Sequence, residues 1–320
     1  MNDAIQNIPP LDTASQDFIR GIGQALQLNQ YVASRVPPRY PSCARRVRDC
    51  GRFAVKRRPI ELCHSAHGYP FMTGVNRCHS RLCRWCHSSL MGVLATHWAA
   101  RAREAERQGL GCAMVRFSVE ACEPGELNAA ITSLLTTFRN SFPSPSRLPK
   151  GWSVNGLALY IGMDWNVAIE WDKNQNVWLP HMHAMAFKDG GAWTETQLAY
   201  LRAQWQGSVE PYAEVADSAE AAARYAVKAS NPKPDLLDLF DLADMRADLL
   251  VEEYLDATIT LSERPRLRTL RSMCRKLSKL LRAKSDLTDE DLARSVDAQR
   301  GGLIATLTEG QWRQATGDLR

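Results

Sequence analysis

The sequence predicts an α+β protein: an antiparallel sheet with helices on one face, preceded by a cysteine-rich module and followed by a helical C-terminal region. Two apolar runs, residues 166–171 and 177–187, are separated by five polar residues, which is typical of a β-hairpin. Strand-like and helix-like segments alternate around this hairpin, from about residue 110 to 232. Six of the nine cysteines lie apart from the hairpin, between residues 43 and 90, which indicates a separate module.

The elements follow from periodicity and from the residues that break it. A polar lead-in contains one helix, over residues 15–32, and the proline-containing stretch 36–41 ends it. Strand-like pieces such as residues 52–55 occur among the cysteines, and a helix is expected from about residue 88 to 107. Farther on, the pattern predicts strands over 114–119 and 157–163, helices over 127–138, 194–206 and 218–229, and a loop over 141–150.

The C-terminal region is expected to be helical and is divided by charge. Residues 235–256 carry eight acidic residues and one arginine, whereas residues 264–284 carry nine basic residues and no acidic one. The chain therefore separates into four segments, which are residues 1–40, 41–90, 91–234 and 235–320.

Composition narrows the class of protein. The chain has 320 residues, of which 45% are hydrophobic and 23% are charged, and this excludes a disordered chain. No apolar run approaches the roughly 20 residues that cross a bilayer, and residues 1–20 lack the basic and apolar regions of a secretory signal. We expect a cytoplasmic protein with no membrane partner. The net charge of +5 does not by itself indicate a polyanionic partner.

A group of cysteines gives the strongest short motif. Cys83 and Cys86 form a C-x-x-C pair, a spacing that lets both thiolates bind one tetrahedral Zn²⁺, and Cys78 lies five residues earlier. Either Cys50 or Cys63 supplies the fourth ligand. The alternatives are a redox C-x-x-C and ordinary buried cysteines, but three cysteines within nine residues and no thioredoxin-like βαβ pattern favour structural zinc.

Basic residues are concentrated beside the first of these cysteines. The stretch from Arg39 to Arg58 contains eight basic residues and one acidic residue. This pattern is typical either of a solvated face or of a DNA-contacting surface. The candidate DNA-binding residues are Arg45, Arg46, Arg48, Arg57 and Arg58.

A histidine pair lies on the second strand of the predicted hairpin. Side chains alternate along a strand, so His181 and His183 point to one face with Cα atoms about 7 Å apart and can share one divalent cation. The third ligand is expected from the facing strand, where Glu170 is preferred to Asp172 because it lies within the apolar run. A mixed imidazole and carboxylate set with open positions suits Mg²⁺ or Mn²⁺ bound to a phosphate.

Tyr225 and Lys228 lie three residues apart in a predicted alanine-rich helix and therefore share a face. A tyrosine hydroxyl ionises near pH 10, so it is a poor nucleophile unless a cation stabilises the phenolate. Lys228 and a nearby metal ion would do this. The alternative interpretation is a packing tyrosine beside a surface charge.

Together these motifs resemble the plasmid rolling-circle replication initiators of the HUH endonuclease superfamily. The resemblance covers roughly residues 45–275, with Glu170 and Trp205 at positions where such proteins carry Glu and Trp. It rests on four motifs in order: Cys50-Gly51; Cys78, Cys83 and Cys86; Pro180-His181-Met182-His183; and Tyr225-Ala226-Val227-Lys228. The match of Cys50-Gly51 makes Cys50 the preferred fourth zinc ligand.

Two positions depart from the family pattern. Leu179 replaces the first histidine of the family's His-Pro-His motif, which leaves His181 and His183 as the ligand histidines. Some relatives carry a glutamate four residues before the tyrosine to activate water at termination, and here that position is Ala221. The neighbouring Glu220 is one residue off, on a different side of the helix.

The resemblance implies an HUH, ferredoxin-like nuclease core in residues 91–234 and an origin-specific initiator of rolling-circle replication. Such a protein binds a plasmid or phage origin with a hairpin, and its bound Mg²⁺ or Mn²⁺ polarises the scissile phosphate while Tyr225 attacks. The products are a 5′-phosphotyrosine and a free 3′-OH that a host DNA polymerase extends. No phosphate-binding G-x-x-x-x-G-K-[ST] loop is present, so a host helicase would unwind the DNA.

Two alternatives compete with this interpretation. A histidine-triad nucleotide hydrolase requires a third histidine where this chain has Met185. A non-catalytic, zinc-dependent DNA-binding regulator fits the cysteines and basic residues equally well, but it has no need of the histidine pair and Tyr225.

Overall fold

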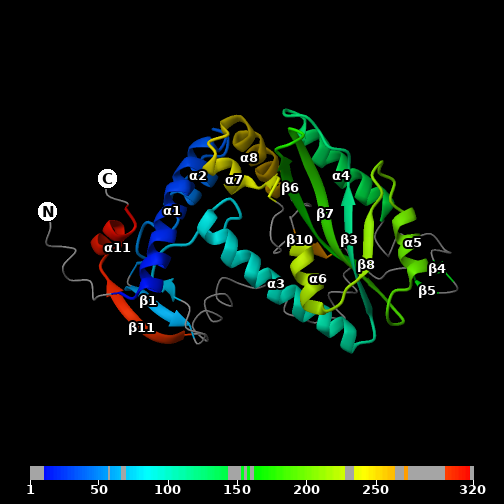
Figure 1. Ribbon diagram of the computed structural model, residues 1–320, viewed down its shortest axis with the longest axis horizontal. Coiled ribbons are helices and arrows are strands. Elements are labelled where there is room, and N and C mark those ends of the chain that lie inside the picture. The colour runs from blue at the N-terminus through cyan, green and yellow to red at the C-terminus, as the bar shows by residue number, and fades with distance from the viewer. Residues whose placement is uncertain are drawn as a thin grey trace. The chain divides into compact units, whose positions relative to one another are not determined.

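The structure is a computed structural model that describes residues 11–56, 58–65, 70–142, 153–154, 157–158, 162–227, 234–263, 270–272 and 300–317. It has α+β architecture with antiparallel sheets, as predicted, and it divides into two compact units (Figure 1). The first unit comprises residues 1–90 and 286–320, and the second comprises residues 91–285. These two units replace the four consecutive segments expected from the sequence. No helix in the described part of the chain combines the length and the apolar character that crossing a membrane requires.

The second unit is built on an antiparallel sheet with the strand order β10-β6-β7-β3-β8. Its central hairpin is the predicted one, because β6 and β7 pair continuously from Gly162 opposite Phe187 to Asp172 opposite Val177. The turn is fixed locally: the Asp172 carboxylate accepts hydrogen bonds from two backbone N–H groups of the loop. The strands are β3 (Gly111–Ser118), β6 (Gly162–Asp172), β7 (Val177–Lys188), β8 (Tyr212–Val215) and β10 (Leu270–Ser272), and the short β9 (Leu236–Leu237) pairs with the end of β6.

Helices cover both faces of this sheet. On the face that carries the two histidines, α6 (Ala219–Val227) packs with the C-terminal part of α3 (Arg84–Arg107) against Met185 and Phe187. On the opposite face, α4 (Leu127–Ser141) brings Phe138 to within 5.5 Å of the Phe117 ring, and α8 (Asp248–Glu263) contacts α4.

The prediction of helices on one face was therefore wrong. The reason is the burial of β7 on both of its faces. Met185 and Phe187 continue the histidine face, Met182 and Ala184 lie on the opposite face, and all four are buried. A strand that is apolar on both faces needs cover on both. A buried ion pair between Arg101 and Asp164, 3.0 Å from Nε to Oδ2, also fixes α3 to β6.

The first unit contains a three-stranded antiparallel sheet with the order β11-β1-β2. Its core joins residues from both ends of the chain, including Leu26, Leu62 and Trp312. Asp12 caps the first helix by accepting a hydrogen bond from the backbone N–H of Ser15. The elements are α1 (Thr13–Arg35), α2 (Pro41–Asp49), β1 (Ile60–Ser65), β2 (Pro70–Thr73), β11 (Arg300–Leu307) and α11 (Glu309–Ala315).

The C-terminal region is not wholly helical, contrary to the prediction. The acidic stretch does form α7 (Leu239–Asp244) and α8, but β10 and β11 are strands. Each of them forms because a distant strand offers an edge: β10 pairs with β6, and β11 pairs with β1. Most of the basic stretch 264–284 lies outside the described residues.

The remaining local predictions have mixed outcomes. The helices expected over 15–32, 88–107, 127–138, 194–206 and 218–229 correspond to α1, α3, α4, α5 (Glu195–Ala203) and α6. The expected strand 52–55 is only an isolated bridge between Ala54 and Val75. The expected strand 157–163 begins with β5 (Leu157–Ala158), which pairs with β4 (Ser153–Val154), and ends with the first residues of β6. Residues 159–161 lie outside the described part. Of the expected loop 141–150, residues 143–150 also lie outside it.

Candidate functional site

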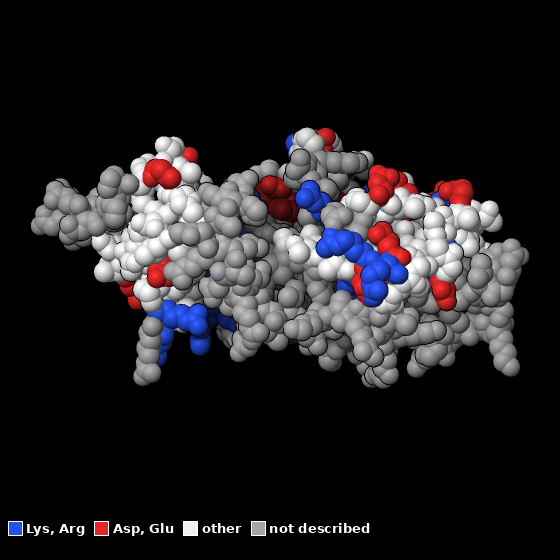
Figure 2. Space-filling view, turned by 90° about the horizontal axis from the view of Figure 1, so that it is seen from below, with Lys and Arg blue, Asp and Glu red and all other residues white. Residues whose placement is uncertain are grey.

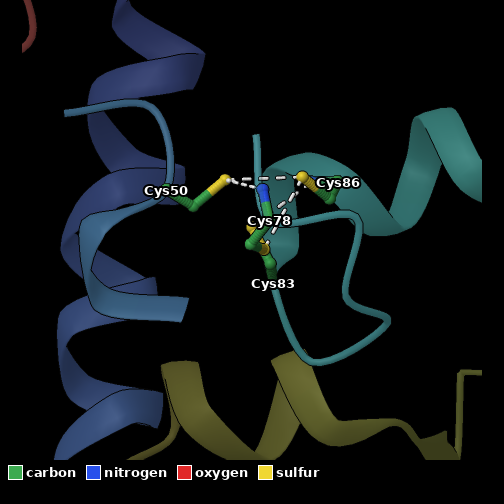
Figure 3. Close-up of side chains that lie close together, drawn as sticks. All are labelled: Cys50, Cys78, Cys83 and Cys86. Atoms are coloured by element: carbon green, nitrogen blue, oxygen red, sulfur yellow. Dashed lines mark hydrogen bonds between the residues drawn. The ribbon is translucent and has the colours of Figure 1, made fainter. Parts of the chain in front are cut away.

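Four cysteines of the first unit form a compact cluster. The sulfur atoms of Cys50, Cys78, Cys83 and Cys86 all lie within 4.8 Å of one another. Figure 3 shows the four side chains gathered in one place. Cys50 follows α2, Cys78 lies in a loop, Cys83 directly precedes α3, and Cys86 lies in the first turn of α3. Cys63 instead lies buried in β1 and is outside the cluster, so Cys50 is the fourth member. Four sulfurs at this spacing could hold a metal ion such as zinc.

Hydrogen-bond donors surround the sulfur atoms. The backbone N–H of Cys86 donates to Sγ of Cys83 at 3.4 Å, and that of Cys78 donates to Sγ of Cys50 at 3.4 Å. The side-chain amide of Asn29 on α1 donates to Sγ of Cys83 at 3.2 Å. Hydrogen bonds from Cys50 and Cys78 lower the pKa of both Cys83 and Cys86, whereas the pKa of Cys50 and that of Cys78 are raised within the same cluster. Cys83 and Cys86 are therefore the two members that favour the thiolate form, in which all four would bind a metal ion.

The backbone conformation at residue 51 explains why a glycine follows Cys50. Its φ of +76° is in the left-handed region, and a Cβ there would lie 2.0 Å from the Trp85 ring. The Gly51 carbonyl also accepts a hydrogen bond of 2.7 Å from the indole N–H of Trp312. The backbone beside Cys50 is therefore held against α3 and α11 by contacts that exclude a side chain.

Asn29 is a positioning residue for the cluster that the sequence did not reveal. It is fully buried, and its carbonyl oxygen accepts a hydrogen bond of 2.8 Å from the backbone N–H of Arg84 while its amide donates to Cys83. Groups that support metal ligands in this way typically contribute 10- to 100-fold to metal affinity.

We expect Asn29→Ala to weaken zinc binding by roughly 10- to 100-fold, because Sγ of Cys83 loses its amide donor and the start of α3 loses its acceptor. Competition with a chromogenic zinc chelator measures this affinity. Gln24→Ala, at an exposed position on the same helix, is the matched control and should leave the affinity unchanged. Equal zinc affinity in the two variants would contradict this role of Asn29.

The histidine face of the second unit is organised in rows across the sheet. Strand register places His183 opposite Asn166 on one side and Arg116 on the other, and His181 opposite Ala168 and Ser118. Glu170 lies on the same face of β6, two residues beyond the partner of His181. The sheet thus brings the three predicted metal ligands together from two neighbouring strands.

The ring of His181 has a defined orientation. Its Nδ1 lies 2.9 Å from the carbonyl oxygen of Leu179, and because a carbonyl only accepts, Nδ1 carries the proton. Its Nε2 lies 3.0 Å from Nε2 of His183 and 3.6 Å from Oε2 of Glu170. All three side chains are buried, with exposed fractions of 3%, 7% and 7% for His181, His183 and Glu170. Two imidazoles and a carboxylate are ligand types that divalent cations bind. The potential ligand atoms of these three residues do not all lie within 4.8 Å of one another. Among the described residues, the four cysteines are the set whose ligand atoms do.

Tyr225 lies directly beside this histidine pair. Its ring, on α6, meets the His183 ring edge to face at a centroid distance of 4.7 Å and an interplanar angle of 86°. Burial raises the pKa of the Tyr225 hydroxyl to about 12, so the phenol is protonated at neutral pH. The helix therefore presents the predicted nucleophile to the predicted metal ligands. Lys228 lies outside the described residues.

Arg116 is a site residue that the sequence analysis missed. It is the charged residue of β3, and its side chain is exposed whereas its neighbours in that strand are buried. The sequence offered one signal for it, which is a single arginine within an otherwise uncharged strand. Trp205, by contrast, packs with Phe117 at 5.0 Å on the face away from the histidines.

The predicted DNA-binding arginines lie in the first unit. Arg45 and Arg46 line a cavity of about 490 Å³ together with Arg77, Cys78 and His79. Arg48 forms an ion pair of 3.0 Å with Asp49, Arg58 is exposed, and Arg57 lies outside the described residues. On the face drawn in Figure 2, basic side chains gather in separate groups, and they form no continuous basic surface over its described part.

Comparisons with protein-family models, with curated proteins and with solved structures find no match for this chain. A functional assignment therefore depends on the residues and the geometry described above.

Proposed function

We propose that this protein is a metal-dependent, site-specific DNA endonuclease that cuts one strand by tyrosine transesterification and so initiates rolling-circle replication of a plasmid or phage. The observation that carries the proposal is the position of Tyr225, whose ring contacts His183 while His181 lies 3.0 Å from His183 and 3.6 Å from Glu170. A nucleophile beside a set of metal-ligating side chains is the arrangement that phosphodiester transesterification needs.

The proposed reaction exchanges one ester for another. The Tyr225 oxygen bonds to phosphorus, the bond from phosphorus to the 3′-oxygen breaks, and the proton of the phenol is transferred to that leaving oxygen. The products are a 5′-phosphotyrosine and a free 3′-OH. Because the phosphodiester count is unchanged, a later 3′-OH can reverse the reaction and reseal the strand without ATP.

His181, His183 and Glu170 would hold a Mg²⁺ or Mn²⁺ ion, which neutralises negative charge on the scissile phosphate. The donor set fits both ions, and its two imidazole nitrogens favour Mn²⁺ because Mg²⁺ prefers oxygen ligands. The His181 ring needs no rearrangement for this role, since its hydrogen bond to the Leu179 carbonyl leaves Nε2 as the ligating atom.

The first unit is proposed to supply affinity for the origin. The arginine-lined cavity lies at the cysteine cluster, where the Arg46 guanidinium donates a hydrogen bond of 3.1 Å to the carbonyl of Cys78. Contacts from these arginines to DNA phosphates would provide salt-dependent binding energy. A host helicase and a host DNA polymerase are the further partners that this role requires, and such a protein works in the cytoplasm.

The proposal is tested with supercoiled DNA that carries the chain's own gene and flanking sequence. In the presence of Mn²⁺ we expect relaxed, nicked circles and a covalent protein–DNA adduct that survives denaturing gel electrophoresis. Protein that binds this DNA with neither nicking nor adduct would favour the competing function, a zinc-dependent DNA-binding regulator, to which the cysteine cluster and the arginine-lined cavity also point.

His181→Ala and His183→Ala should each abolish nicking, because each removes an imidazole nitrogen from the proposed ion. Binding to the same DNA should change less than threefold, since phosphate contacts elsewhere provide most of the affinity. Gel-shift and nicking assays on the same preparations measure both. His64→Ala, on β1 of the first unit, is the matched control and should nick normally. Nicking by either variant at the unaltered rate would exclude these ligands.

A further inference from the structure

A cavity of about 450 Å³ opens beside the histidine pair and has two chemically different sides. One side carries the carboxylates of Glu170, Asp172 and Asp235, together with His181. The other side carries Arg116 and Ser118. Carboxylates and imidazoles suit a cation, whereas a guanidinium and a hydroxyl suit an anion. The cavity therefore has complementary places for both parts of a metal–phosphate pair.

The position of Arg116 is fixed by the sheet. On β3 it lies opposite His183 of β7 on one side and Tyr212 of β8 on the other, and Ser118 lies opposite His181. All of these residues point to the histidine face, because cross-strand partners share a face. The guanidinium is thus anchored one strand away from both histidines of the proposed metal site.

The side chain of Arg116 is also oriented. Its Nε donates a hydrogen bond of 3.3 Å to the Ser118 hydroxyl, which directs the guanidinium along the sheet toward the cavity. A guanidinium presents five N–H donors in a planar fork that matches two oxygens of a phosphate. Arg116 is the one arginine or lysine among the described residues that line this cavity. It is therefore the group to which an oxyanion would bind.

Arg116 and the nucleophile both lie beside the same histidine. The Tyr225 ring on α6 meets the His183 ring at a centroid distance of 4.7 Å. Arg116 is the cross-strand partner of His183 on β3. The subsite is therefore adjacent to the histidine that Tyr225 contacts.

We propose that Arg116 and Ser118 form the oxyanion subsite that holds the scissile phosphodiester between the metal ligands and Tyr225. This assignment rests on the proposed function and deepens it. One non-bridging oxygen of the phosphate would face the metal ligands and the other would bind the Arg116 guanidinium.

Phosphate binding tests the subsite without any turnover. Inorganic phosphate is titrated into Mn²⁺-loaded protein and followed by ³¹P NMR line broadening. Arg116→Ala should weaken phosphate binding at least tenfold, and Arg139→Ala, at an exposed position on α4 against the opposite face, should not. Equal phosphate affinity in the two variants overturns the assignment, whether or not the unaltered protein cleaves DNA.

Cleavage then separates a chemical role from a structural one. Single-turnover cleavage of a nick-site oligonucleotide by Arg116→Ala should slow by on the order of 100-fold, as for removal of one oxyanion donor. Added guanidinium ion should restore part of the rate, whereas added sodium ion should not, and Arg116→Lys should be intermediate. A loss that neither guanidinium nor lysine repairs overturns the assignment. Failure of the unaltered protein to cleave or form an adduct would instead contradict the proposed function.

Discussion

Nicking and covalent attachment to DNA should disappear in a Tyr225→Phe protein, while binding to the origin survives. The substitution removes one hydroxyl and keeps the aromatic ring that packs edge to face on His183 at 4.7 Å. Loss of a covalent nucleophile lowers the rate by on the order of 10³-fold or more. Gel-shift titration and the supercoiled-DNA assay, performed on one preparation, measure binding and nicking separately.

Two other tyrosines provide the comparison. Tyr200→Phe, on α5 outside the site, should nick at the unaltered rate. Tyr212 is half exposed on β8 and hydrogen-bonds to Glu214, so Tyr212→Phe tests the nearest rival nucleophile and should still form the adduct. A Tyr225→Phe protein that still nicks would remove the basis for the assignment.

Cys83→Ser or Cys86→Ser should release the metal and unfold much of the first unit. A structural zinc ion in a small module contributes on the order of 10 kcal/mol of folding free energy, and here its ligands connect the end of α2 to the start of α3. We expect about one zinc ion per chain in the unaltered protein and close to none in either variant. Elemental mass spectrometry gives the zinc content, and limited proteolysis should show new cleavage within residues 45–90.

Zinc content also distinguishes Cys50 from Cys63, the two candidates for the fourth ligand. Cys50→Ser should lose zinc, because Cys50 lies in the cluster. Cys63→Ala should keep it, because Cys63 is buried in β1 and lies outside the cluster. Full zinc content in the Cys83→Ser, Cys86→Ser and Cys50→Ser proteins would show that the cluster is not a metal site.

The hairpin and its histidines could be predicted because the relevant signals are local. Two apolar runs around a five-residue polar loop define the strands, and the period of two along β7 places His181 and His183 on one face. Glu170 follows from the same pairing. The position of Tyr225 against His183 came from the family resemblance and has no local signal.

Other features depend on contacts between distant residues and were not predictable. β11 pairs with β1 across more than 200 residues, so its apolar run alone does not reveal that the C-terminus completes the first unit. Asn29 acts on Cys83 through a hydrogen bond across 54 residues. Arg116 acquires a role only when β3 is placed next to β7, opposite His183. These residues show where tertiary structure adds to the sequence pattern.

The central claim is that Tyr225 forms the covalent bond to DNA, and identification of the adduct tests it most directly. The nicked product is digested with protease and nuclease, and the phosphorylated peptide is sequenced by tandem mass spectrometry. Our account predicts a 5′-nucleotide phosphate on Tyr225. A phosphate on Tyr200 or Tyr212 would contradict it.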